Sequence, residues 1–126
     1  MPADPAPAGE RLPRRETLRR SSDYQACYRQ GRRRHGALAT LHLRPNGLDA
    51  PRLGLTASRK VGGAVVRNRL KRWTREIYRR GGLRAALPPL DLVVHFKPAA
   101  REGGFAELEA ELARLLGQAA EAARRA

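Results

Sequence analysis

Hydrophobic residues recur at the period of an α-helix in the segment that begins near Ala64. Four of them form a single stripe along such a helix: Val66, Leu70, Trp73 and Ile77. The opposite side carries one asparagine and five cations: Arg67, Asn68, Lys71, Arg72, Arg75 and Arg79. Arg69 lies nearer the apolar stripe, and Glu76, at its border, is the one acid of the segment. The pattern predicts a helix with one buried face and one strongly positive face.

Shorter patterns on either side predict the remaining elements. They are an extended segment at 17–20, a helix that begins at Ser22 and stops at Gly31, strands at 37–44, 52–59 and 90–97, and a final helix striped by Phe105, Leu108, Leu112, Leu115 and Ala119. The strand at 37–44 alternates apolar and polar residues, which is typical of a half-buried strand. The basic run at 32–34 is interpreted as a connection. The order β-α-β-β-α-β-α indicates an α/β (α+β) two-layer sandwich, with helices over one face of a small mixed four-stranded sheet.

Composition sets the expected limits of the domain. Residues 1–13 are rich in Pro and Ala and show no periodicity, so we expect a disordered N-terminal tail. Residues 14–120 are expected to form a single domain, because a chain of 126 residues can bury one hydrophobic core. Residues 121–126 are expected to fray.

Positive charge is concentrated in the first two thirds of the chain. The formal net charge is +14, and residues 11–80 hold 20 basic and 4 acidic residues, whereas residues 81–126 hold 6 of each. This imbalance favours a nucleic acid or an anionic membrane surface as the partner, with a solvated surface helix as the alternative. No apolar run approaches the length of a membrane span, and the single cysteine, Cys27, cannot form an internal disulfide. We therefore expect a soluble cytoplasmic protein with no membrane partner.

Residues that could carry catalysis do not converge in the sequence. His35, His42 and His95 are scattered, and no Ser-His-Asp order, metal-ligand spacing or carboxylate cluster is found. Asp91 is interpreted as a turn or cap residue, His95 as a satisfied core histidine, and Trp73 as a core residue. We therefore predict no catalytic residue and no metal ion bound by the protein alone.

One long motif carries a resemblance to a known family. The segment Leu53-Gly-Leu-Thr-Ala-Ser-Arg-Lys-Val-Gly-Gly-Ala-Val-Val-Arg-Asn-Arg-Leu-Lys-Arg72 resembles the signature of the bacterial ribonuclease P protein component. That signature is a strand ending in Ser-Arg/Lys-Lys, a glycine turn, and a helix that opens on Arg-Asn-Arg-x-Lys-Arg. Residues 18–28 and Gly31 resemble the first helix of the family, which carries two aromatic residues four positions apart. The segments that begin at Asp91 and Phe105 resemble its last strand and helix, so the match extends from about residue 17 to residue 117.

The resemblance implies both a fold and a function. The family fold is an α/β sandwich with a left-handed crossover, and its members bind a large catalytic RNA in a holoenzyme that removes the 5′ leader from precursor tRNA. The RNA performs the hydrolysis with Mg²⁺, which it chiefly binds, and no obligate protein partner is implied. The residues that would face the catalytic RNA are Arg59, Lys60, Arg67, Asn68, Arg69, Lys71, Arg72 and Arg75. Tyr24, Tyr28 and His42 would line a cleft for the leader, with His42 in a place where the family often has an aromatic residue.

Three alternatives remain. A basic ribosomal protein or RNA chaperone with the same sandwich would share the charge pattern without any link to tRNA cleavage. A small metal-dependent nuclease would need acids near the basic face, yet half of the chain's acids lie in its C-terminal third. In the third alternative, Tyr24 and Tyr28 would not contact a leader and would serve only to close the first helix onto the sheet.

Overall fold

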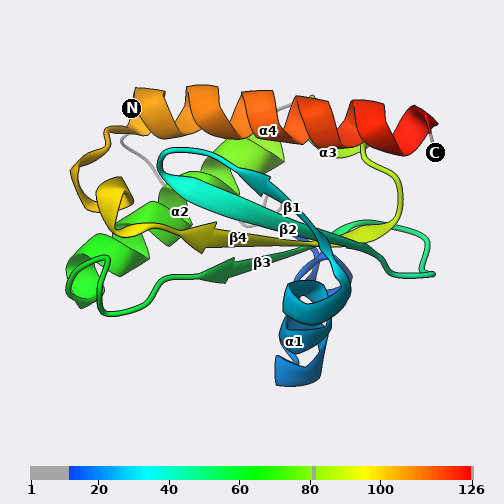
Figure 1. The fold of residues 1–126 in the computed structure, drawn as a ribbon, viewed down its shortest axis with the longest axis horizontal. Coiled ribbons are helices and arrows are strands. Elements are labelled where there is room, and N and C mark those ends of the chain that lie inside the picture. Colours follow the sequence, from blue (N-terminus) through cyan, green and yellow to red (C-terminus); the bar gives the residue numbers. More distant parts are fainter. Residues whose placement is uncertain (1–11, 81, 126) are drawn as a thin grey trace.

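A four-stranded sheet runs through the centre of the molecule and has helices on both faces (Figure 1). The computed structural model describes residues 12–80 and 82–125. The strands are β1 (Arg32–His35), β2 (Ala39–Pro45), β3 (Arg52–Thr56) and β4 (Leu90–Phe96), in the spatial order β1-β2-β4-β3. The pairs β1–β2 and β2–β4 are antiparallel, whereas β3 and β4 are parallel. The prediction of a small mixed four-stranded sheet in an α+β fold is therefore confirmed.

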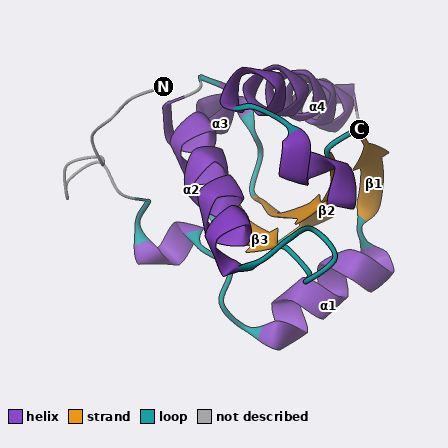
Figure 2. Ribbon diagram, turned by 90° about the vertical axis from the view of Figure 1, so that its left-hand side faces the viewer, coloured by secondary structure: helices purple, strands orange, loops and turns teal. Residues whose placement is uncertain are grey.

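The helices divide unequally between the two faces of the sheet. They are α1 (Ser21–Gln30), α2 (Ala64–Arg80), the short α3 (Leu83–Ala86) and α4 (Phe105–Arg125), with 3-10 turns η2 (Arg14–Glu16) and η3 (Pro98–Glu102). The helices α2 and α4 bury their apolar stripes in the main core on one face, whereas α1 packs on the other face (Figures 1 and 2). The single helical layer expected from the sequence is therefore wrong for α1.

The structure differs from the prediction on both sides of α1. Thr17 forms only an isolated parallel bridge with Leu53, and the Leu18 N–H donates to the Leu53 carbonyl at 2.8 Å, so residues 17–20 do not form a strand. The basic run at 32–34, interpreted as a connection, belongs to β1. As a largely exposed edge strand, β1 has no alternation of buried and exposed residues to reveal it.

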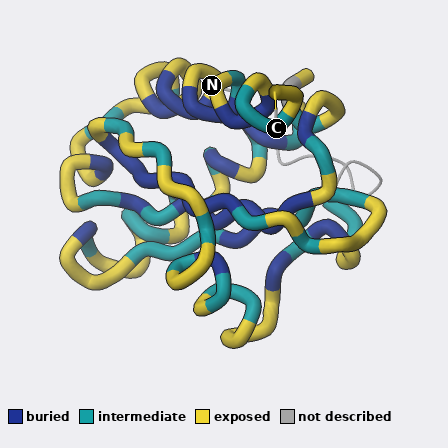
Figure 3. The backbone as a smooth tube through the Cα atoms, turned by 45° about the vertical axis from the view of Figure 1, so that its right-hand side comes forward, coloured by how far each residue is buried: buried dark blue, intermediate teal, exposed yellow. Residues whose placement is uncertain are grey.

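Strand β2 is buried on both faces. Its first five residues, 39–43, are all buried. Buried backbone runs through the middle of the molecule (Figure 3). Leu41 and Leu43 face the main core, whereas His42 faces α1. The prediction of a half-buried strand is wrong because α1 covers the face that was expected to meet solvent.

A buried ion pair joins β3 to β4. Asp91 is 0% exposed, and its carboxylate accepts hydrogen bonds from Nε and Nη2 of Arg52, both at 2.7 Å. Asn46 donates to the same carboxylate at 3.1 Å, and Asp23 of α1 lies 3.6 Å from Arg52. The hydrogen bonds to Asp91 raise the pKa of Arg52. Asp91 is thus an internal anchor of the sheet, and its interpretation as a turn or cap residue is wrong.

A second buried carboxylate holds the turn between β1 and β2. Glu111 of α4 accepts hydrogen bonds from the backbone N–H groups of Ala37, Leu38 and Ala39 at 2.8–3.1 Å. A Cβ at Gly36 would lie 2.4 Å from the Glu111 side chain, so glycine lets the turn approach the carboxylate. Lys97 donates to the Gly36 carbonyl at 2.6 Å.

The ends of the domain lie slightly outside the predicted limits. Leu12 packs against the main core, and the prediction for residues 1–11 lies outside the described residues. At the other end α4 continues to Arg125, whose guanidinium pairs with Glu121 at 2.6 Å. Helical structure therefore extends into the segment that was expected to fray.

Replacing Asp91 with Asn should destabilise the fold by about 2 kcal/mol, since half-buried Arg52 would lose its two charge-assisted hydrogen bonds to the buried carboxylate. Exposed Asp49 gives the matched control, because Asp49→Asn removes the same charge and should change stability by less than about 0.5 kcal/mol. Urea unfolding of both variants measures the difference. Equal stability of the two variants would contradict the anchoring role of Asp91.

Candidate nucleic-acid interface

The first three turns of α2 present cations that have no acidic partner among the described residues. Gly62, at φ 154°, makes the turn into the helix, which begins at Ala64 as the sequence predicted. The exposed members of the predicted RNA-facing set are Arg59, Lys60, Asn68, Arg72 and Arg75, while Arg67, Arg69 and Lys71 are half-buried. Within residues 12–80 and 82–125, none of the cations in this set forms an ion pair. The surface therefore keeps its positive charge available for an anion.

The single acid of α2 neutralises only the end of the helix. Glu76 pairs with Arg79 at 2.9 Å and with Arg80 at 2.7 Å. Arg79, placed on the cationic face by the sequence pattern, is therefore already engaged. The unpaired charge is concentrated between Arg59 and Arg75.

Arg69 is a packing residue as much as a surface cation. Its guanidinium lies over the Trp73 ring at 5.1 Å and donates to the carbonyl of Arg101 in η3 at 3.4 Å. Trp73 packs against the core and meets the Phe105 ring edge-on at 5.7 Å. This arrangement agrees with the position of Arg69 near the apolar stripe. The RNA-facing role of the whole set stays a prediction.

The two tyrosines of α1 lie on the opposite face of the sheet. A Cβ at Gly54 would lie 2.7 Å from the Tyr24 ring, so glycine makes room for that ring against β3. The Tyr24 hydroxyl donates to the Leu18 carbonyl and accepts from the Leu55 N–H, both at 3.3 Å. Both rings are half-buried, and with Leu18, Cys27 and Val93 they form a second small core.

Two histidines that are distant in sequence, His42 and His95, lie beside Tyr28. The Tyr28 hydroxyl lies 2.7 Å from Thr56 Oγ1 and 3.1 Å from His95 Nδ1, and the His42 ring centroid lies 4.6 Å from that of Tyr28. His35 lies 3.3 Å from Thr40 on the same face. The three histidines, scattered in the sequence, therefore lie on one polar face of the sheet. The alternation of residues along the strands could predict this face only after 32–35 had been recognised as a strand.

His42 is buried rather than presented as a stacking surface. Its side chain is 8% exposed, and its Nδ1 atom has no hydrogen-bond partner in the described part of the chain. Burial lowers the pKa of His42, and the nearby His95, Arg33 and His35 lower it further. The ring is therefore neutral at neutral pH, and any charge offered to a phosphate here must come from a neighbour. Direct contact of His42 with a leader stays a prediction.

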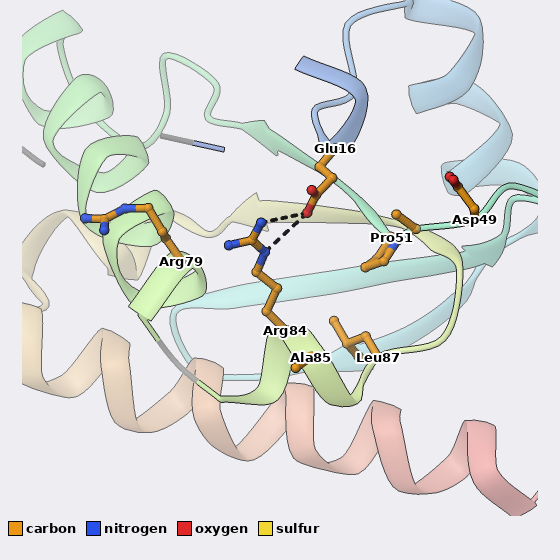
Figure 4. Close-up of a pocket in the computed structure, with 8 residues that line it drawn as sticks. Glu16, Asp49, Pro51, Arg79, Arg84, Ala85 and Leu87 are labelled. Atoms are coloured by element: carbon orange, nitrogen blue, oxygen red, sulfur yellow. Dashed lines mark hydrogen bonds and ion pairs between the residues drawn. The ribbon is translucent and has the colours of Figure 1, made fainter. Parts of the chain in front are cut away.

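A separate hollow lies where η2, the loop before β3 and the C-terminal end of α2 meet (Figure 4). Its volume is about 440 Å³. Arg84 reaches Glu16 through two hydrogen bonds of 2.9 and 3.2 Å, and Arg79 is paired with Glu76. Glu16 and both arginines that line the hollow are thus already paired within the fold, which makes it a weaker candidate than the two surfaces above.

Among the described residues, no three histidine, cysteine or acidic side chains gather where they could hold a metal ion. No helix in the described ranges is long and apolar enough to cross a membrane.

The buried His42 should make stability depend on pH. Because its folded pKa lies below the unfolded value of about 6.5, the unfolded chain binds the proton more readily, so stability should fall as pH drops below about 6.5. In His42→Gln, the free energy of unfolding should change less between about pH 7.5 and about pH 5.5 than in the wild type. His35→Gln, at an exposed position, serves as the control. Urea unfolding at both pH values tests this, and an unchanged pH dependence in His42→Gln would contradict it.

Comparison with known proteins gives a consistent result. A family model described as Ribonuclease P matches residues 12–120. The ribonuclease P protein component of Acidothermus cellulolyticus is 45% identical over 111 residues, which cover 85% of this chain and 90% of the relative. That of Streptomyces avermitilis is 41% identical over 120 residues, covering 84% and 96%.

Solved structures agree with this result. The ribonuclease P protein of Thermotoga maritima superposes with a TM-score of 0.73 at 32% identity, covering 82% of this chain and 96% of the other. A Staphylococcus aureus ribonuclease P protein gives a TM-score of 0.76 at 25% identity, covering 82% and 94%. The motif on β3 and α2, the fold and these matches together show that the chain belongs to the ribonuclease P protein family.

Proposed function

We propose that this chain is the protein subunit of a cytoplasmic ribonuclease P holoenzyme that removes the 5′ leader from precursor tRNA. The observation that carries the proposal is the row of cations from Arg59 to Arg75, which form no ion pair within the described residues and lie on the opposite side of the sheet from a tyrosine-lined face. Two separate surfaces suit a protein that contacts two RNA molecules. In this proposal the α2 surface binds the catalytic RNA, and the α1 face receives the leader.

The protein contributes positive charge rather than a catalytic group. Phosphates of the leader and the catalytic RNA repel each other, and cations between them reduce that repulsion. The RNA, with the Mg²⁺ that it binds, performs the hydrolysis. Neutralisation by the protein should therefore lower the concentration of Mg²⁺ that the RNA needs.

The tyrosines suit a leader of variable sequence. An aromatic ring stacks on any base, and base stacking is typically worth about 1–3 kcal/mol. The hydroxyl contacts of Tyr24 and Tyr28 fix the orientation of the two rings. A surface held in this way can accept single-stranded RNA without reading its sequence.

Incubation of the purified protein with precursor tRNA, with and without its cognate catalytic RNA, tests the proposal. The protein alone should not cleave, and adding it to the RNA should give cleavage at a lower Mg²⁺ concentration. Cleavage by RNA-free protein would indicate a nuclease in its own right. Co-sedimentation with ribosomes, without any effect on cleavage, would instead support a ribosomal protein or RNA chaperone.

Replacing both Arg72 and Arg75 with Gln should weaken binding of the catalytic RNA and leave the fold intact, since both side chains are exposed. The plot of log K against log salt should become shallower by up to about two units, roughly one for each lost phosphate contact. The double variant Arg124→Gln/Arg125→Gln removes the same charge from the end of α4 and should keep the original slope. Equal slopes in the two variants would show that the α2 cations are only solvated.

Replacing Tyr28 with Leu should weaken holoenzyme binding to precursor tRNA by up to about tenfold, and binding to mature tRNA should not change. Tyr28→Phe, which keeps the ring and loses the contacts to Thr56 and His95, should retain most of the affinity. Equal weakening for both tRNAs, or a lower melting temperature as the only effect, would show that Tyr28 merely closes α1 onto the sheet.

A further inference from the structure

The sheet face beside α1 continues onto β1, where Arg33 and His35 are exposed. Helix α1 packs over β2 and β4. In the β1–β2 register Arg33 lies opposite His42, and His35 lies opposite Thr40. Residues paired in this way project from the same face of a sheet, so Arg33 and His35 belong to the face that carries His42 and Tyr28. Both are exposed, and they form an open strip beside the tyrosines.

The charge on this face is uneven from one edge of the sheet to the other. On the β3 side, Arg52 is neutralised by Asp91 and Asp23. On the β1 side, no carboxylate in residues 12–80 and 82–125 pairs with Arg33. An anionic chain that crosses this face is therefore attracted electrostatically to Arg33 on β1. It gains little attraction from Arg52 on β3, whose charge is already neutralised.

The distances suit a single strand of RNA. The Tyr28 and His42 rings are 4.6 Å apart, and Arg33 stands on the next strand, about 5 Å farther along the sheet. A base on Tyr28 and a phosphate on Arg33 can thus belong to neighbouring nucleotides. The α2 cations lie on the opposite side of the sheet, so this strip is not a continuation of that surface.

We propose that β1 extends the leader-binding face, with the Arg33 guanidinium paired to a phosphate of the leader whose base stacks near Tyr28. This inference rests on the proposed function. In this proposal the leader continues from the tyrosines over β1. The sequence pattern did not identify β1 as a strand.

The test compares Arg33→Gln with Arg32→Gln in the reconstituted holoenzyme. Arg32 is exposed on the same strand and loses the same charge, but it pairs with Leu43 and projects to the other face. Arg33→Gln should weaken binding of precursor tRNA roughly fivefold, make the salt slope shallower by about 0.7, and leave mature tRNA unaffected. Arg32→Gln should match the wild type, and Arg33→Lys should recover most of the affinity.

Each other outcome overturns the proposal. Equal effects of Arg33→Gln and Arg32→Gln would show a general effect of charge, and equal loss for precursor and mature tRNA would place Arg33 on the tRNA body. If Tyr28→Leu gives a leader-dependent loss and Arg33→Gln does not, the role of β1 fails and the proposed function stands. If neither variant does so and the protein leaves cleavage by the RNA unchanged, the proposed function itself fails.

Discussion

The buried pair of Arg52 and Asp91 joins the elements on which both proposed surfaces depend. It ties β3 to β4 within the sheet, and Asp23 of α1 and Asn46 of the preceding loop reach the same charges. Strand β3 leads directly into α2, whereas α1 carries the tyrosines. Because these contacts lie at one point of the sheet, they constrain the cationic helix and the aromatic face relative to each other.

Four acids of the described residues, Glu16, Asp23, Asp91 and Glu111, hold elements of the fold together. Asp91 and Glu111 are buried in contacts with Arg52 and with the turn before β2, and Glu16 binds Arg84. Glu76 serves the last turn of α2. No acid of the described residues pairs with the cations in the first three turns of α2 or in strand β1. The positive surface therefore follows from where the acids of the fold are placed.

The sequence predicted α2 and the main core well, because a long helix with a regular apolar stripe carries a strong periodic signal. It also identified Arg69 as the cation nearest that stripe. The motif around Gly62 then indicated the family, which composition and periodicity could not do. Burial confirms Leu70 and Ile77 as core residues.

Features that depend on long-range contacts could not be predicted. Strand β1 contains only basic residues, and it is an edge strand held by pairing with β2. The turn that joins it to β2 is held by Glu111, which lies far away in the sequence. The position of α1 on the second face decides the burial of His42, and a strand pattern gives no sign of that cover. Asp91 resembled a cap residue because its partner Arg52 lies on a strand distant in sequence.

Site-directed cross-linking tests most directly the claim that the protein has two separate RNA surfaces. Cys27 is buried and its pKa is raised to about 11, mainly by burial, so the native thiol should not compete with an introduced one. A photo-cross-linker on Asn68→Cys of α2 should label the catalytic RNA, and one on Gln25→Cys of α1 should label the leader of precursor tRNA. Labelling of the same RNA segment from both positions would contradict the account.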